Sequence, residues 1–170
     1  MNKSAVALIS AALVAGSMLA ADAAGTTGAA PPASSVITAH EAYKLYSGKT
    51  WIWSDGAAYF APDRKFIAWT GTGNAINYGE GEWRVTPTGR VCFFAVWSSA
   101  SGHAKATNCF GHRTVNNTIY QQKEPGGVWY VFKSPSAKSD DEYAKLKPGD
   151  LASGGVTRVK AELKALGGRG

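Results

Sequence analysis

Between residues 49 and 133 the chain alternates short runs of strand-forming residues with turn-forming residues, and this alternation restricts the fold more than any other feature. The runs are rich in Trp, Tyr, Phe, Val and Thr, which are the residue types enriched in β-strands. Most of the links are hairpin-sized, among them Asp55-Gly56 and Asn116-Asn117. The pattern predicts seven to eight strands, at residues 50–54, 57–61, 65–70, 79–86, 90–98, 106–113, 118–123 and 128–133.

Links this short force consecutive strands to be antiparallel neighbours. A meander of this length either stacks as two sheets or closes into a small barrel, and closure removes the exposed edges. A chain of 170 residues suits one domain with a real core rather than two domains. The sequence therefore predicts a mainly β fold, a small antiparallel meander barrel or sandwich, with a short N-terminal helix and a C-terminal helical tail.

Two of the predicted strands have different burial patterns. In residues 79–86, Trp83 and Val85 alternate with charged and polar side chains, so one face of that strand is predicted to be exposed. In residues 91–97 the side chains on both faces are apolar. That strand is predicted to be buried on both sides, under the N-terminal helix.

The helices are predicted from capping signals. Thr38 and Glu41 form a capping box, and a stripe of Ala and Tyr follows at helical spacing until Gly48. We expect this short helix to pack on the sheet or to plug its end. Ser139 and Glu142 form a second capping box, which predicts a short helix to Lys147. A last amphipathic stretch follows, and the sequence leaves open whether it docks on the domain.

The N-terminus has the pattern of a secretory signal peptide, with Lys3 before an Ala-rich apolar run and small residues at Ala21 and Ala23. The predicted organisation is a signal peptide at residues 1–23, a flexible linker at 24–37, a β domain at 38–150 and a helical or flexible tail at 151–170. The predicted location is the periplasm or the exterior of the cell.

The formal net charge of +6 is spread along the chain without a basic stripe. The sequence therefore gives no sign of nucleic-acid binding. An exported protein of this charge can associate with an anionic membrane surface or an acidic polysaccharide, or the charge serves only solubility.

Cys92 and Cys109 are the only cysteines, and an even count in an exported chain favours a disulfide. A hairpin folded about residues 99–105 places Cys92 opposite Cys109. His103 and His112 flank Cys109, but the first cysteine of a haem-attachment motif is absent and zinc would need more ligands, so no metal and no cofactor is predicted.

An ordered set of short motifs resembles an uncharacterised proteobacterial family of exported proteins, domain-of-unknown-function family 995. The resemblance covers about residues 38–150 and implies an all-β domain in a periplasmic or secreted bacterial protein, without implying an activity. The motifs that carry it are Tyr43-Lys44-Leu45-Tyr46, Gly48-Lys49-Thr50-Trp51, Ala58-Tyr59-Phe60, Gly81-Glu82-Trp83, Arg90-Val91-Cys92-Phe93, Cys109-Phe110-Gly111-His112 and Trp129-Tyr130-Val131-Phe132-Lys133.

Catalytic motifs are scarce in this sequence. It contains neither a G-x-S-x-G elbow nor an H-E-x-x-H motif. Glu80 and Glu82 project from one strand face about 7 Å apart, a spacing compatible with paired glycosidase carboxylates, but a solvated outer face is the favoured explanation for them. His40, His103 and His112 have no evident nucleophile beside them. No catalytic residue is predicted.

Six tryptophans fall mostly one to a strand and are the candidate ligand-binding residues: Trp51, Trp53, Trp69, Trp83, Trp97 and Trp129. They either line a cavity for an apolar ligand or an envelope glycan, or they fill the core. The sequence predicts an exported, non-enzymatic envelope or ligand-binding protein. The alternatives are a secreted polysaccharide-acting hydrolase or lyase, and a partner-binding or inhibitor module.

Overall fold

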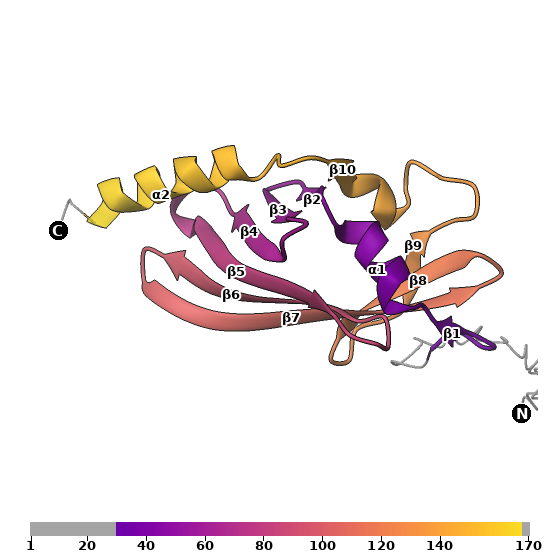
Figure 1. Cartoon of the computed structure of the whole chain (residues 1–170). Coiled ribbons are helices and arrows are strands. Elements are labelled where there is room, and N and C mark those ends of the chain that lie inside the picture. Colours follow the sequence, from indigo (N-terminus) through magenta and orange to yellow (C-terminus); the bar gives the residue numbers. More distant parts are fainter. Residues whose placement is uncertain (1–29, 168–170) are drawn as a thin grey trace, which may run out of the picture.

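The computed structural model describes residues 30–167, and its centre is one antiparallel sheet of ten strands that curls into a half-barrel (Figure 1). Along the sheet the strands are ordered β10-β2-β3-β4-β5-β6-β7-β8-β9, while β1 pairs with β7. The strands are β1 (Ser35–Val36), β2 (Lys49–Trp53), β3 (Gly56–Phe60), β4 (Lys65–Thr70), β5 (Asn77–Val85), β6 (Val91–Ser99), β7 (Gly102–Val115), β8 (Thr118–Glu124), β9 (Tyr130–Lys133) and β10 (Leu146–Pro148).

The predicted mainly β antiparallel meander is confirmed. Each of the eight predicted strands overlaps one of the eight consecutive strands β2 to β9, and each of these strands pairs with the next along the chain. The two short strands β1 and β10 were missed, because two or three residues do not establish an alternation. The 3₁₀ turn η1 (Gly73–Ala75) occupies the predicted loop before β5.

Helix α1 (Ala39–Tyr46) begins at the predicted capping box, in which the Glu41 backbone N–H donates to Thr38 Oγ1 and Glu41 accepts from the Thr38 backbone N–H. Its buried residues, Ala42, Leu45 and Tyr46, belong to the hydrophobic core. The predicted packing of this helix against the sheet is therefore confirmed, and Figure 1 shows α1 at one end of the half-barrel, between β2 and β8.

The prediction for the segment after β9 was wrong. The carboxylate of Asp141 accepts hydrogen bonds from the Ser134 hydroxyl and from the backbone N–H groups of Ser134 and Lys138, and Ser139 caps nothing. The chain forms only the 3₁₀ turn η2 (Glu142–Lys145) before it enters β10, because pairing with β2 takes its backbone groups from residue 146 onward.

The C-terminal tail forms helix α2 (Ser153–Gly167). Its buried residues are Val156 and Val159, and it packs on the outer side of the sheet against β3, β4 and β5. Gly155 lies directly on the indole of Trp69, and Lys160 forms an ion pair of 2.7 Å with Glu80. The first part of the tail is therefore docked on the sheet, as far as Lys160.

The prediction that β6 is buried on both faces was wrong. Phe94 and Val96 on its outer face are 42% and 43% exposed. The sheet is a single layer at this point, because α2 covers β3 to β5 and no other described element covers the outer face of β6.

The hairpin between β6 and β7 has the predicted register, with Cys92 opposite Cys109, but its loop is shorter than predicted. Ser99 already pairs with Gly102, so the strands continue through the polar residues that were assigned to a loop of residues 99–105. Cys92 and Cys109 form the predicted disulfide.

The predicted signal peptide at residues 1–23 lies outside the described residues. The linker predicted at 24–37 ends earlier than expected, because residues 35–36 form β1 and Ile37 is buried in the core. The ordered fold therefore begins before residue 38.

Candidate functional site

The inner, concave face of the half-barrel contains a cavity of about 440 Å³. Its walls come from strands β2 to β4 and β6 to β8 and from η2, so residues far apart in the sequence meet there. Aromatic and small side chains make up most of the lining, with a few polar groups. The lining residues are Trp51, Trp53, Ala58, Phe60, Phe66, Ala68, Thr70, Phe93, Trp97, Asn108, Phe110, Lys123 and Glu142.

Two of the tryptophans in the cavity lie across glycines of the neighbouring strands. A methyl group at Gly56 would come within 2.4 Å of the Trp53 indole, and one at Gly79 within 2.9 Å of the Trp97 indole. Gly56 pairs with Trp53, and Gly79 pairs with Trp97. Because the glycines have no side chain, each ring covers the backbone of the adjacent strand.

Near these two rings, the strand between them, β4, has small side chains at the cavity, Ala68 and Thr70. Ala68 pairs with Gly79, and Thr70 pairs with Gly56. The Trp53 indole N–H donates to Thr70 Oγ1 at 3.4 Å, which directs this ring toward β4. The two indoles therefore cover the strands on either side of β4 and form an aromatic floor that remains partly exposed.

Deeper in the cavity the aromatic rings pack on one another. Phe66 and Phe93 stack with their centroids 4.5 Å apart, and Phe60 meets Phe66 edge-on at 5.4 Å. Trp51 reaches across the concave face from β2 to Phe110 on β7, with centroids 5.2 Å apart. The cavity thus has a densely packed apolar wall.

The polar lining groups, apart from Thr70, are Asn108, Lys123 and Glu142. Lys123 pairs with Phe110 in the β7–β8 ladder, and Asn108 precedes Phe110 by two residues on the same face. The Glu142 carboxylate accepts a hydrogen bond of 2.8 Å from the Trp51 indole N–H and forms an ion pair of 2.8 Å with Lys145. The three groups therefore surround the contact between Trp51 and Phe110.

A buried polar cluster lies beside this end of the cavity. His112 Nδ1 lies 3.1 Å from the Gly89 carbonyl, which can only accept, so Nδ1 carries the proton and Nε2 accepts from the Tyr46 hydroxyl at 2.9 Å. The Tyr46 oxygen accepts in turn from the Gln121 amide, whose oxygen accepts from the Tyr130 hydroxyl. The cluster is a chain of donors and acceptors in which each side chain is satisfied.

Burial determines the protonation states of this cluster. It lowers the pKa of His112 from 6.5 to about 4 and raises the pKa of Tyr46 and of Tyr130 well above 10. The negative charge of Glu142 raises the pKa of both tyrosines further. At neutral pH the cluster is uncharged and supports the wall of the cavity.

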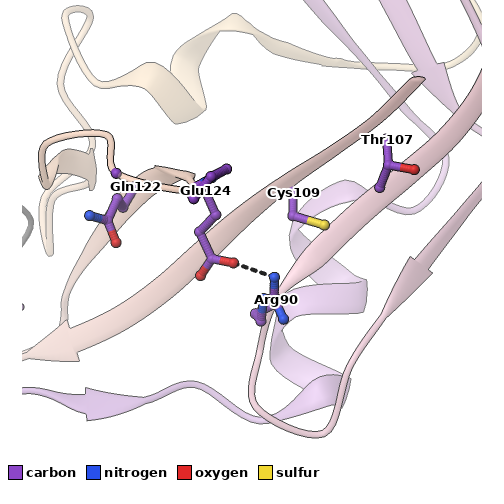
Figure 2. Close-up of a pocket in the computed structure, with 7 residues that line it drawn as sticks. Arg90, Thr107, Cys109, Gln122 and Glu124 are labelled. Carbon is purple, nitrogen blue, oxygen red and sulfur yellow. Dashed lines mark ion pairs between the residues drawn. The ribbon is translucent and has the colours of Figure 1, made fainter.

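A second hollow, of about 470 Å³, lies at the disulfide (Figure 2). It is lined by Arg90, Thr107, Cys109, Gln122, Glu124, Pro125 and Gly126. Figure 2 shows the Arg90 guanidinium directed at the Glu124 carboxylate, and the two form an ion pair of 2.5 Å. This hollow is slightly larger than the concave cavity but lacks aromatic walls, and its two opposite charges neutralise each other, so it is the weaker candidate for a ligand site.

Glu80 and Glu82 are exposed on the outer, convex face. Glu80 pairs with Lys160 at 2.7 Å, and Glu82 pairs with Arg84 at 2.9 Å. Both residues line a hollow of about 340 Å³ beside Phe94. They lie on the opposite side of the sheet from the aromatic cavity.

The structure brings Trp51, Trp53 and Trp97 together in the cavity and places the other three tryptophans elsewhere. Trp83 is fully buried and donates to the Ala61 carbonyl at 2.8 Å, so it is part of the core. Trp69 lies under α2, with the Arg158 guanidinium 4.9 Å from its ring. Trp129 lies near Gly111, and its buried indole N–H has no hydrogen-bond partner among residues 30–167.

The three histidines have different surroundings. His112 is in the buried cluster, His40 is exposed on α1, and His103 Nδ1 lies 2.7 Å from the Ser98 hydroxyl on the adjacent strand. In the described part of the chain, no three His, Cys, Asp or Glu side chains are grouped so as to hold a metal ion. The described helices include none that is long and apolar enough to span a membrane.

None of the four polar cavity residues, Thr70, Asn108, Lys123 and Glu142, was identified from the sequence. Asn108 shares its strand face with Phe110 and His112, and Lys123 shares its face with Gln121. A polar side chain on an inward face was therefore a usable signal for both residues. Glu142 had no such signal, because it reaches the cavity from a turn whose position depends on the pairing of β10.

Comparison with known proteins gives one match. A family model described as a protein of unknown function, DUF995, matches residues 11–152. Neither a curated protein nor a solved structure matches the chain.

Proposed function

This chain belongs to the DUF995 family of proteins of unknown function, and we propose that it is a non-enzymatic binding protein that holds a small apolar ligand in the concave face of its half-barrel. The observation that carries the proposal is the aromatic floor made by Trp53 and Trp97. The core around Phe60, Phe66 and Trp83 is already closely packed and fully or almost fully buried. The indoles of Trp53 and Trp97 remain partly exposed beside an open volume.

The size and chemistry of the cavity support a small-molecule ligand. A volume of about 440 Å³ falls within the range of small-molecule sites, which are mostly apolar with a few polar groups that orient the ligand. Ring faces, Ala58 and Ala68 supply the apolar surface, while Asn108, Lys123 and Glu142 supply the polar groups. An envelope glycan would need more hydrogen-bond partners along its length than this lining offers, so we favour an apolar ligand.

We further propose that the protein works outside the cytoplasm, in the periplasm or secreted from a bacterial cell. The disulfide between Cys92 and Cys109 is compatible with a non-cytoplasmic protein. The signal-peptide pattern of residues 1–23 agrees with this location. An apolar ligand in such a compartment would need a carrier or a sensor, because its free concentration in water is low.

The proposal is tested by titrating the protein with the neutral fluorescent probe N-phenyl-1-naphthylamine, with dodecanol as the competitor. We expect saturable fluorescence enhancement that dodecanol reverses. The Thr70→Phe variant places a ring over β4 between the two indoles and should weaken probe binding at least ten-fold. The matched control is Thr107→Phe, which adds the same ring on the outer face of β7 and should bind the probe as the wild type does.

Two results would contradict the proposal. The first is a probe signal that does not saturate or that dodecanol does not reverse. The second is a Thr70→Phe variant that keeps the wild-type circular dichroism spectrum and also binds the probe with unchanged affinity. Saturable quenching of Trp fluorescence by a soluble glycan, without any response to dodecanol, would favour the glycan ligand instead.

A further inference from the structure

We infer that the ligand carries a carboxylate, held by Lys123 and Asn108, at one end of an apolar body that lies on the aromatic floor. This inference rests on the proposed function and names the ligand class for the same cavity. It follows from where the polar groups of the cavity lie and from which of its two charged side chains takes part in no ion pair among the residues that the structure describes.

The lining of the cavity is asymmetric. The end at Trp53, Ala68 and Trp97 has the Thr70 hydroxyl as its polar group, and the Trp53 indole N–H already donates to that hydroxyl. The other end has the Lys123 ammonium, the Asn108 amide and the Glu142 carboxylate. A ligand that fills the cavity therefore meets apolar surface at one end and charged groups at the other, which is the pattern that an amphiphile matches.

The two charges at the polar end are not equivalent. Glu142 is bound by the Trp51 indole N–H and by Lys145, each at 2.8 Å, and its side chain is only 21% exposed. Lys123 takes part in none of the ion pairs formed among residues 30–167. The charge available to a ligand is thus positive, so the complementary head group is an anion.

The number of donors favours a carboxylate among the anionic head groups. One ammonium and one amide N–H₂ can each donate to one oxygen of a two-oxygen group. Lys123 and Asn108 flank Phe110 on neighbouring strands, because Lys123 pairs with Phe110 and Asn108 lies two residues before it on the same face. Cross-strand diagonal neighbours of this kind lie about 7 Å apart at Cα, and a carboxylate can bridge the ends of two such side chains.

The test compares three molecules with the same twelve-carbon tail, namely dodecanoate, dodecanol and dodecyltrimethylammonium. Each is titrated below its critical micelle concentration against N-phenyl-1-naphthylamine bound to the protein. We expect dodecanoate to bind about five-fold more tightly than dodecanol at low salt, because Lys123 is solvent-exposed and an exposed ion pair is weak. The preference should vanish at 0.5 M NaCl, while dodecanol binding should not weaken with salt.

Two variants separate the head-group site from the apolar site. Lys123→Gln should abolish the preference, so that dodecanoate and dodecanol bind this variant with equal affinity. Lys105→Gln is the matched control, because Lys105 is an exposed lysine of the adjacent strand β7 that lines the convex hollow instead. It should keep the wild-type preference for dodecanoate.

The outcomes distinguish this inference from the proposed function. Equal affinities for dodecanoate and dodecanol, or a preference for dodecyltrimethylammonium, would overturn the carboxylate assignment and leave the apolar site standing. A preference for dodecanoate that survives in Lys123→Gln would also overturn it. Failure of all three molecules to displace the probe would overturn the proposed function itself.

Discussion

Lowering the pH from 7 to 5 is predicted to destabilise the protein through one side chain, His112. Burial lowers its pKa in the folded protein from 6.5 to about 4, because the protonated imidazole would have to lie in the core beside Tyr46 and Gln121. The unfolded chain therefore binds a proton at a higher pH than the folded chain does. Below pH 6.5 this difference favours unfolding. The contribution of the neutral His112 to the free energy of unfolding is fully lost once the pH falls below 4.

The size of the effect follows from the two pKa values. At pH 5 almost every unfolded chain has a protonated residue 112, whereas about one folded chain in ten does. The free energy of unfolding should consequently fall by about 2 kcal/mol between pH 7 and pH 5. The carboxyl groups of Glu41, Asp141 and Asp150, whose pKa values are lowered in the fold, lose their stabilisation only below about pH 4.5, so this window isolates the histidine.

Urea denaturation at a series of pH values, followed by Trp fluorescence and extrapolated linearly to zero urea, measures this loss. The His112→Gln variant should be less stable than the wild type at pH 7, because it loses part of the hydrogen-bonded chain, but its stability should change little between pH 7 and pH 5. His40→Gln alters an exposed residue and should keep the wild-type slope. A wild type whose stability is constant over this range, or a His112→Gln variant with the wild-type slope, would refute the reasoning.

Three further predictions concern the parts of the fold that hold the cavity. The double variant Cys92→Ala/Cys109→Ala should lose about 3 kcal/mol in the free energy of urea unfolding, since the disulfide closes a loop over a sequence separation of 17. Gly155→Val should undock α2 because its side chain would collide with the Trp69 indole, and limited proteolysis should then cleave the chain after residue 150. Gly79→Val should displace the indole that covers it and weaken binding of N-phenyl-1-naphthylamine at least five-fold, while circular dichroism reports an intact sheet.

The strands and their order could be predicted from the sequence because each one depends on local information. Hairpin-sized links make neighbours antiparallel, and the capping box at Thr38 fixes the start of α1 without any tertiary contact. The Cys92–Cys109 register also followed from a local hairpin. The elements that were missed or misassigned, β1, β10 and η2, exist because distant strands pair with them or lie beside them.

The candidate site was only partly predictable for the same reason. A tryptophan on a strand can face the cavity, the core or an outer helix, and the alternation of residues does not say which face the sheet curls around. Trp83 and Trp97 lie on adjacent strands, yet one is fully buried and the other is partly exposed. The difference depends on Gly79, which gives the Trp97 ring a place to lie, and on α1, which covers the end where Trp83 lies.

The indole N–H signals of the six tryptophans give the most direct test of the claim that the concave cavity binds the ligand. In a ¹H–¹⁵N correlation spectrum each indole contributes one cross-peak, which single Trp→Phe variants assign. On titration with dodecanoate, the peaks of the three tryptophans in the cavity, Trp51, Trp53 and Trp97, should shift together and saturate, and those of Trp69, Trp83 and Trp129 should stay in place. A spectrum in which no peak moves, or in which the second set moves and the first does not, would contradict the account.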